Sequence, residues 1–264
     1  MRRNIITAPV RKVGEDFAVS EQDLLAVEEP LEIRIGGRVA AVTMRTPGDD
    51  RELAAGFLFT EGILERAGQI AGIAETARNV VEVTLASEAA VDLSRLERHF
   101  YVSSSCGVCG KASIEAVYAL GCIAPPRGEP SVDASVVRAL PAKLRSTQAV
   151  FERTGGLHAA GLFDAAGELL AVREDVGRHN AVDKLIGAEF LAGRTPLHGR
   201  ILMVSGRTSF ELVQKALVAG VPMLAAVGAP SSLAVELALR FGMTLAGFVR
   251  DGRFNLYSGE ARVH

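Results

Sequence analysis

The segment that decides the fold is ILMVSGRTSFELVQKALVAGVPMLAAVGAPSSLAVELALRF, residues 201–241. It holds two short apolar runs, 201–205 and 222–227, and each is followed by a stretch of helical periodicity, 209–219 and 231–241. Short apolar runs bounded by turn residues are typical of strands buried on both faces, and their alternation with helices indicates a parallel sheet. We therefore predict an α/β architecture in which these two strands are neighbours.

The flanking sequence extends this prediction to a C-terminal domain, residues 126–264. Residues 158–164 and 168–174 predict a hairpin around the turn at 165–167, and residues 245–249 and 254–257 predict a second hairpin around Asp251-Gly252. Helices are expected at 134–151 and 180–192. The proline-rich stretch 125–130 reads as a linker that begins the domain.

Residues 1–125 predict a separate N-terminal α+β region. Residues 1–25 are polar and mixed, which indicates an arm. Residues 31–35 and 38–44 alternate around Gly36-Gly37 and predict a hairpin, followed by a helix at 51–64 and a strand at 79–85. The region ends in the small, glycine-rich loop 101–111, after which a helix is expected at about 112–120.

Composition excludes several classes of protein. The 264 residues carry a net charge of −2, and the pI of about 6.2 argues against a nucleic-acid-binding surface. No apolar run approaches the roughly 18 residues of a membrane span, and the N-terminus lacks the apolar core of a signal peptide. Three cysteines in a chain of this length do not indicate a disulfide framework, so a cytoplasmic location is expected.

The strongest chemical candidate is the pair Cys106-Gly-Val-Cys109 in the loop 101–111. A zinc site needs further ligands at matching spacing, and a redox pair is expected at a helix start after a strand, so both fit poorly. An inert thiol pair remains possible. A sulfur carrier needs an exposed thiolate on a pliable segment, which the glycines and Lys111 favour. Cys122 is the cysteine that we expect to be buried.

Polar groups follow the predicted strands and favour an anion site. Residues 205–209 and 228–232 are glycine- and hydroxyl-rich and open helices, where free backbone N–H groups bind phosphate, although plain helix capping is the alternative. Thr208 and Glu211 have the spacing of a capping box. Residues 173–184, with Arg178-His179-Asn180 at a helix start, are a further candidate site. His158 is as compatible with core packing as with a site.

Five ordered motifs together resemble the FdhD family, the formate dehydrogenase accessory sulfur carriers. They are SSSCGVCGK (103–111), TGGLHAAGLF (154–163), REDVGRHNAVDKLIG (173–187), SGRTSFELVQKA (205–216) and GVPMLAAVGAPSSLAVELA (220–238). The resemblance spans about residues 30–258. It implies a sulfurtransferase that accepts persulfide sulfur from a cysteine desulfurase and delivers it to bis-molybdopterin guanine dinucleotide (Mo-bis-MGD) for formate dehydrogenase.

The resemblance also assigns residues. It places the persulfide on Cys106, with Cys109 in support, and it assigns cofactor binding to Phe248, Val249, Arg250, Asp251, Gly252 and Arg253. To these we add Arg207, Ser209 and His179 from the strand ends. The resemblance further implies a homodimer and a cytidine deaminase-like, three-layer C-terminal domain with a mixed sheet.

The zinc chemistry of the deaminases is not expected here. The deaminase signature is H-x-E followed by P-C-x-x-C, whereas His158 is followed by two alanines and the cysteine pair precedes it. We therefore expect no metal site. The main rival function is a non-catalytic chaperone that binds the cofactor and docks on formate dehydrogenase.

Overall fold

The structure is a computed structural model that describes residues 4–89, 91–92, 117, 122 and 124–264. The loop 101–111, with Cys106 and Cys109, lies outside the described residues. So does most of the helix expected at about 112–120, of which Val117 alone is described, in helical conformation.

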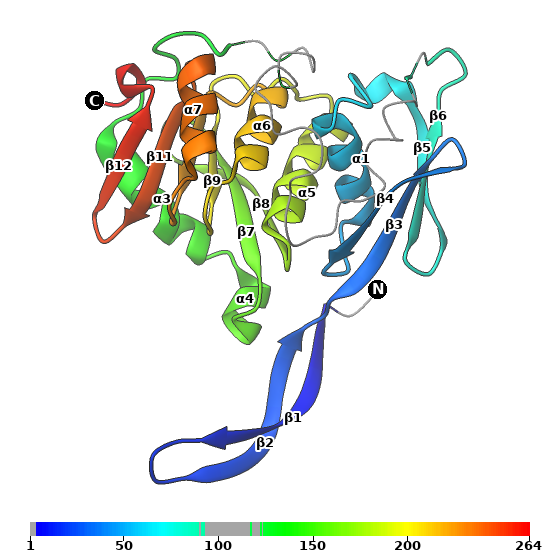
Figure 1. Ribbon diagram of the computed structural model, residues 1–264, viewed down its shortest axis with the longest axis vertical. Coiled ribbons are helices and arrows are strands. Elements are labelled where there is room, and N and C mark those ends of the chain that lie inside the picture. Colours follow the sequence, from blue (N-terminus) through cyan, green and yellow to red (C-terminus); the bar gives the residue numbers. More distant parts are fainter. Residues whose placement is uncertain (1–3, 90, 93–116, 118–121, 123) are drawn as a thin grey trace.

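The C-terminal half is built on a six-stranded sheet of order β12-β11-β10-β9-β7-β8 (Figure 1). The strands are β7 (His158–Phe163), β8 (Leu169–Asp175), β9 (Ile201–Val204), β10 (Met223–Ala226), β11 (Thr244–Arg250) and β12 (Arg253–Ser258). Strands β9, β10 and β11 are parallel neighbours, while β7, β8 and β12 each run antiparallel to the strand they pair with. The predicted α/β class with a mixed sheet is confirmed.

Helices cover both faces of this sheet. Helices α5 (Arg178–Leu191), α6 (Phe210–Val218) and α7 (Ser232–Phe241) lie on one face, and α3 (Ala134–Arg145) lies on the other (Figure 1). Successive residues of β9 point to opposite faces of the sheet. Leu202 and Val204 belong to the core under α5–α7, whereas Ile201 and Met203 belong to the core under α3. This alternation explains why the strand is apolar at every position.

The helix predicted at 134–151 is wrong as a single element, because the chain forms α3 and then a short helix α4 (Ala149–Thr154). The hydroxyls of Ser146 and Thr147 donate to the carbonyl oxygens of Lys143 and Leu144, at 2.9 and 2.8 Å. Such local bonds compete with continuation of the helix. The break turns α4 away from α3 at the edge of the sheet.

The N-terminal half contains a four-stranded sheet of order β4-β3-β6-β5 and helix α1 (Asp50–Thr60). Its strands are β3 (Glu29–Ile35), β4 (Arg38–Arg45), β5 (Ile70–Ala77) and β6 (Val80–Leu85). The β3–β4 hairpin is confirmed. Helix α1 ends before its predicted end at 64, because Gly62 adopts a φ of +70° that no helix continues. Strand β5 was not predicted, since its sequence IAGIAETA has little β-branched content.

The two halves meet through α1 and α5. A Cβ added to Gly56 would lie 1.8 Å from the carbonyl oxygen of Asp183, and one added to Gly187 would lie 1.9 Å from that of Glu52. The two helix backbones therefore touch, which only glycine permits. A single apolar core runs from β3 and β6 through α1 and α5 to the large sheet.

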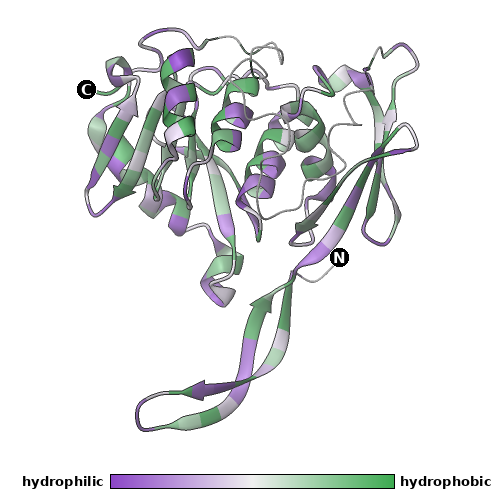
Figure 2. Ribbon diagram, viewed as in Figure 1, coloured by the Kyte–Doolittle hydropathy of each residue, from purple (hydrophilic) through white to green (hydrophobic). Residues whose placement is uncertain are grey.

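The N-terminal arm is a β-hairpin, β1 (Ile5–Val13) and β2 (Ala18–Ala26), that projects from the rest of the chain (Figure 1). Hydrophilic and hydrophobic residues are mixed along both of its strands (Figure 2). The exposed apolar residues are Ile6, Val13, Phe17, Val19 and Leu25. The arm was predicted from its polar, mixed sequence, but its hairpin was not.

Candidate functional site

The loops after β9 and β10, residues 205–209 and 227–231, lie side by side at the carboxyl ends of these parallel strands. We call this place the strand-end edge. The amide of Thr208 donates to the carbonyl of Ala229 (3.1 Å), and the amide of Ser231 donates to the carbonyl of Thr208 (2.9 Å). A third bond joins the amide of Gly228 to the carbonyl of Gly206 (3.0 Å). The two strand ends therefore lie together, as the sequence predicts. Open α/β sheets bind ligands at this position.

Glycine 228 keeps these loops close. A Cβ there would lie 2.9 Å from the carbonyl oxygen of Gly206 and 3.0 Å from the Cα and Cγ of Arg207. The stem of Arg207 packs on this glycine, and its side chain is exposed at the edge. The guanidinium is thus available to an anionic ligand.

Helix α6 begins at this edge without a side-chain cap. Its N-cap residue is Ser209, but no side chain caps the first turn, so the capping box expected from Thr208 and Glu211 is wrong. The Ser209 hydroxyl instead lies 3.0 Å from Nε2 of His179 at the start of α5. The first amides of α6 therefore lack the side-chain acceptor that a capping box supplies, and such amides bind anions.

The two histidines of this region are held neutral. Burial, assisted by the charges of Lys215 and Arg178, lowers the pKa of His179 to about 3. Burial and Arg178 also lower the pKa of His158, which begins β7 beside Gly206. Both imidazoles therefore act as hydrogen-bonding groups at neutral pH and contribute no positive charge to the edge.

Two buried polar atoms at this edge have no hydrogen-bond partner within the described residues. They are Oγ1 of Thr208, in a residue that is 1% exposed, and Nε of Arg178 at the start of α5. Buried polar atoms are normally satisfied, so these two atoms at the strand ends are candidates for pairing with a bound ligand.

The predicted cofactor-binding residues 248–253 lie at the same edge. The amide of Phe248 donates to the carbonyl of Gly228 (3.1 Å), which joins the end of β11 to the β10 loop. Phe248 and Asp251 have φ values of +53° and +54°, in the left-handed region that non-glycine residues rarely adopt. Arg250 is exposed, and its guanidinium carbon lies 5.6 Å from the ring centre of Phe248.

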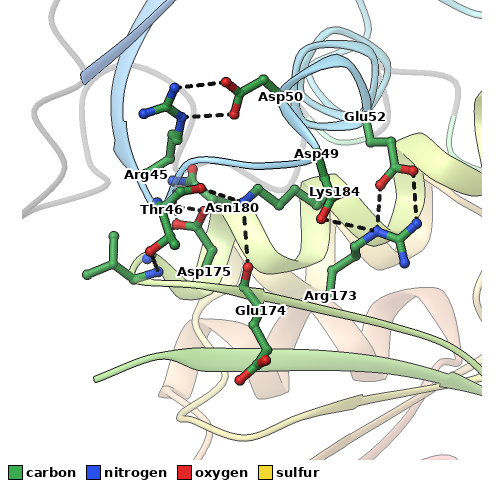
Figure 3. A network of polar contacts seen from close by, with 12 residues as sticks. Arg45, Thr46, Asp49, Asp50, Glu52, Arg173, Glu174, Asp175, Asn180 and Lys184 are labelled. Carbon is green, nitrogen blue, oxygen red and sulfur yellow. Dashed lines mark hydrogen bonds and ion pairs between the residues drawn. The ribbon is translucent and has the colours of Figure 1, made fainter. Parts of the chain in front are cut away.

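A buried polar network fixes the start of α5 behind this edge (Figure 3). Asp175, fully buried at the end of β8, pairs with Lys184 of α5 at 2.7 Å. The same carboxylate accepts from the amides of Gly177 (2.8 Å) and Thr46 (3.1 Å) and from the side chain of Asn180 (3.0 Å). It thereby ties the N-terminal half to the helix that carries His179.

The segment 173–184 was predicted as a binding site. Some of its residues join the two halves of the chain, and others lie at the strand-end edge. Asp175 and Lys184 hold the halves together, and Asp183 is buried against Lys215 of α6 at 2.9 Å. Arg173 pairs with Glu52 of α1 through two hydrogen bonds, at 2.5 and 2.9 Å. Arg178 and His179 remain at the edge. No local pattern in the sequence signals this division, because the partners come from α1, from α6 and from Thr46 just after β4.

Cys122 is the one cysteine among the described residues. Cys122 is partly buried, and burial raises the pKa of its thiol to about 11, which makes it a poor nucleophile. Within the described residues no cluster of three or more metal-binding side chains occurs. In that same part of the chain, no helix has the length and apolarity needed to cross a membrane.

Comparison with known proteins gives concordant relatives. Residues 26–264 match the FdhD/NarQ family. Curated relatives named sulfur carrier protein FdhD include those of Streptomyces avermitilis (52% identical, covering 94% of this chain and 92% of the relative), Mycobacterium tuberculosis (48%, 96% and 96%) and Sulfolobus acidocaldarius (42%, 96% and 96%).

A solved structure shares the fold. The crystal structure of a candidate formate dehydrogenase accessory protein from Desulfotalea psychrophila superposes with a TM-score of 0.80 and is 24% identical in sequence. The match covers 99% of this chain and 100% of that protein. At this identity the likeness bears on the fold alone.

Proposed function

The chain belongs to the FdhD/NarQ family, and from this premise we propose that it is a sulfur carrier that activates formate dehydrogenase by transferring sulfur to Mo-bis-MGD. One observation carries the proposal: over nearly its full length, the chain is 52% identical in sequence to a curated sulfur carrier. The sequence also contains the pair Cys106-Gly-Val-Cys109. The cytoplasm, where desulfurases and free thiols coexist, is the compartment in which this chemistry would run.

Sulfur enters by thiol exchange on Cys106. The Cys106 thiolate attacks the outer sulfur of a persulfide on a cysteine desulfurase, and the sulfur–sulfur bond of the donor breaks. The desulfurase cysteine leaves as a thiolate, and Cys106 becomes a persulfide. No net oxidation occurs, because the sulfane sulfur moves with its oxidation state unchanged.

Sulfur leaves when a thiol attacks the inner sulfur of that persulfide. The outer sulfur departs as hydrosulfide toward the molybdenum of the cargo, and a disulfide forms on the protein side. Cys109 is separated from Cys106 by two residues and is the thiol that we assign to this step. A cellular dithiol reductant then restores both thiols.

The cargo binds at the strand-end edge. Arg207, Arg250 and Arg253 supply exposed positive charge, and the uncapped start of α6 supplies backbone donors for the phosphates of the dinucleotide. The unpaired Thr208 hydroxyl is a further donor on the same loop. His179, kept neutral, holds Ser209 in place.

A comparison of variants tests the proposal against the chaperone alternative. Formate dehydrogenase is matured in cells that contain the wild-type chain, Cys106→Ala or, as a control, Cys122→Ser. A sulfur carrier requires that Cys106→Ala yields inactive enzyme with cofactor inserted, while Cys122→Ser yields active enzyme. Full activity with Cys106→Ala would instead establish a chaperone that only binds the cofactor. Sedimentation of the purified chain tests the homodimer that the family resemblance implies.

A further inference from the structure

Arg178 is a partly buried cation that makes no ion pair in the described part of the chain. It is the first residue of helix α5, at the strand-end edge, and its Nε is buried without a hydrogen-bond partner among the described residues. Removing a charge from water is costly unless a charge of opposite sign pairs with it. The guanidinium of Arg178 is therefore a candidate for pairing with an anionic ligand.

The carboxylates near the start of α5 are engaged with other groups. Asp175 pairs with Lys184 at 2.7 Å and accepts three further hydrogen bonds. Glu211, in the first turn of α6, lies 3.9 Å from Nε2 of the neutral His179. Neither carboxylate makes an ion pair with Arg178, so the positive charge of Arg178 is left for a ligand.

Two more polar side chains at this edge lack a hydrogen bond within the described residues. The hydroxyl of Thr208 is buried, in a residue that is 1% exposed, and the imidazole of His158 is the other. His158 shares its face of β7 with Ala160, which packs in the core under α5–α7, so its ring lies on the α5 side of the sheet. Gly206 makes room for the ring, since a Cβ there would lie 3.3 Å from Nδ1 of His158.

These groups suit a small anion with a single charge. Helices α5 and α6 both begin here without a side-chain cap, and the amides of their first turns add positive potential. The two histidines are neutral, because burial and the charge of Arg178 lower the pKa of each. One guanidinium balances one negative charge, whereas a phosphate dianion would keep a second charge uncompensated in partly buried surroundings. A guanidinium is also weakly hydrated, which favours pairing away from water.

We propose that Arg178 binds the hydrosulfide anion that leaves the Cys106 persulfide, and that it thereby promotes the release of sulfur. His158 and Thr208 complete the site as neutral hydrogen-bond donors. The identity of the anion rests on the proposed function.

The release step moves negative charge from one sulfur to another. The thiolate of Cys109 attacks the inner sulfur of the persulfide, the bond between the two persulfide sulfurs breaks, and a Cys106–Cys109 disulfide forms. The outer sulfur leaves with the bonding electron pair and its proton, as hydrosulfide. A fixed cation at the place where this charge develops stabilises the transition state.

Calorimetric titration of the Cys106→Ala chain with hydrosulfide, without oxygen, tests the site apart from sulfur transfer. We expect saturable binding of hydrosulfide and weaker binding of inorganic phosphate. Adding Arg178→Met should weaken hydrosulfide binding about tenfold or more, because a hydrogen bond between charged groups is lost. The matched control, Arg138→Met at an exposed position of α3 on the other face of the sheet, should bind as Cys106→Ala alone does.

Thermal melts separate loss of binding from loss of folding. Arg178→Met is expected to melt no lower than its parent, since it removes a partly buried charge without an ion-pair partner in the described chain. Thr208→Val is the second variant. It keeps the branched shape of the side chain, removes the buried hydroxyl, and should also weaken binding.

The role in release is tested on the chain with both cysteines, after a cysteine desulfurase has loaded it with sulfur. Arg178→Met should load as the wild type does but release hydrosulfide about tenfold more slowly or less, and Arg178→Lys should recover part of the rate. Tighter binding of phosphate than of hydrosulfide, unchanged binding in Arg178→Met, or an unchanged release rate would each overturn the proposal. A wild-type chain that accepts no sulfur would refute the proposed function instead, and the titration would still decide whether the anion site exists.

Discussion

Replacing Asp175 by alanine should be among the most destabilising single changes in this chain. Its carboxylate is fully buried and pairs with Lys184, which is 1% exposed, at 2.7 Å. Asp175→Ala leaves the ammonium of Lys184 uncompensated, which costs about 3–5 kcal/mol for a buried pair. It also removes the acceptor for the amides of Thr46 and Gly177. Against a total stability of about 5–15 kcal/mol, this loss is large.

Urea unfolding followed by circular dichroism measures the effect, with the free-energy change taken from the midpoint at constant slope. The informative control is the double variant Asp175→Ala/Lys184→Met, which removes the buried ammonium of Lys184 together with its partner carboxylate. We expect it to be more stable than Asp175→Ala alone by about 1–2 kcal/mol. The reasoning is refuted if Asp175→Ala costs less than about 1 kcal/mol or if the double variant is the less stable of the two.

Two further predictions concern the helix contact and the neutral histidine. Gly56→Ala should destabilise the chain by about 2 kcal/mol or more, because the new Cβ meets the Asp183 carbonyl at 1.8 Å, whereas Gly68→Ala, with open space around it, should be nearly neutral in thermal melts. A neutral Gly56→Ala would show that α1 and α5 are not in backbone contact. Because the pKa of His179 is lowered to about 3 from 6.5, the unfolded chain takes up the proton first, so stability falls as pH drops through this window. Between pH 7 and 5 the wild type should lose about 1–2 kcal/mol more than His179→Gln in urea titrations, and equal losses would contradict the assignment.

The strand-end edge was predictable because its signals are local in sequence. Apolar runs that end in Ser205-Gly206 and Val227-Gly228 predict buried strands followed by turns, and parallel neighbours place those turns together. The left-handed backbone at Phe248 carries no comparable signal. The helix break at Ser146 and Thr147 was missed because hydroxyl residues are tolerated inside helices as well as at their ends.

The capping of α4 and the buried ion pairs could not be predicted, since they depend on contacts between distant segments. Gln148 is one polar residue in a helical stretch until Glu174, 26 positions later, takes over the capping of α4. Likewise, Lys184 reads as a solvated charge until Thr46 and Asp175 enclose it. The hydrophobic periodicity of a sequence indicates which face of a helix or strand is apolar. It does not indicate which distant side chains contact that helix or strand.

The most direct test of the central claim is the mass of the cysteine peptides after the chain is incubated with a cysteine desulfurase and L-cysteine. The account predicts that the peptide containing Cys106 gains one sulfur atom, that the gain disappears on treatment with a thiol reductant, and that Cys106→Ala abolishes it while Cys122→Ser does not. Sulfur that is found on Cys122, or that still loads the peptide in Cys106→Ala, would contradict it.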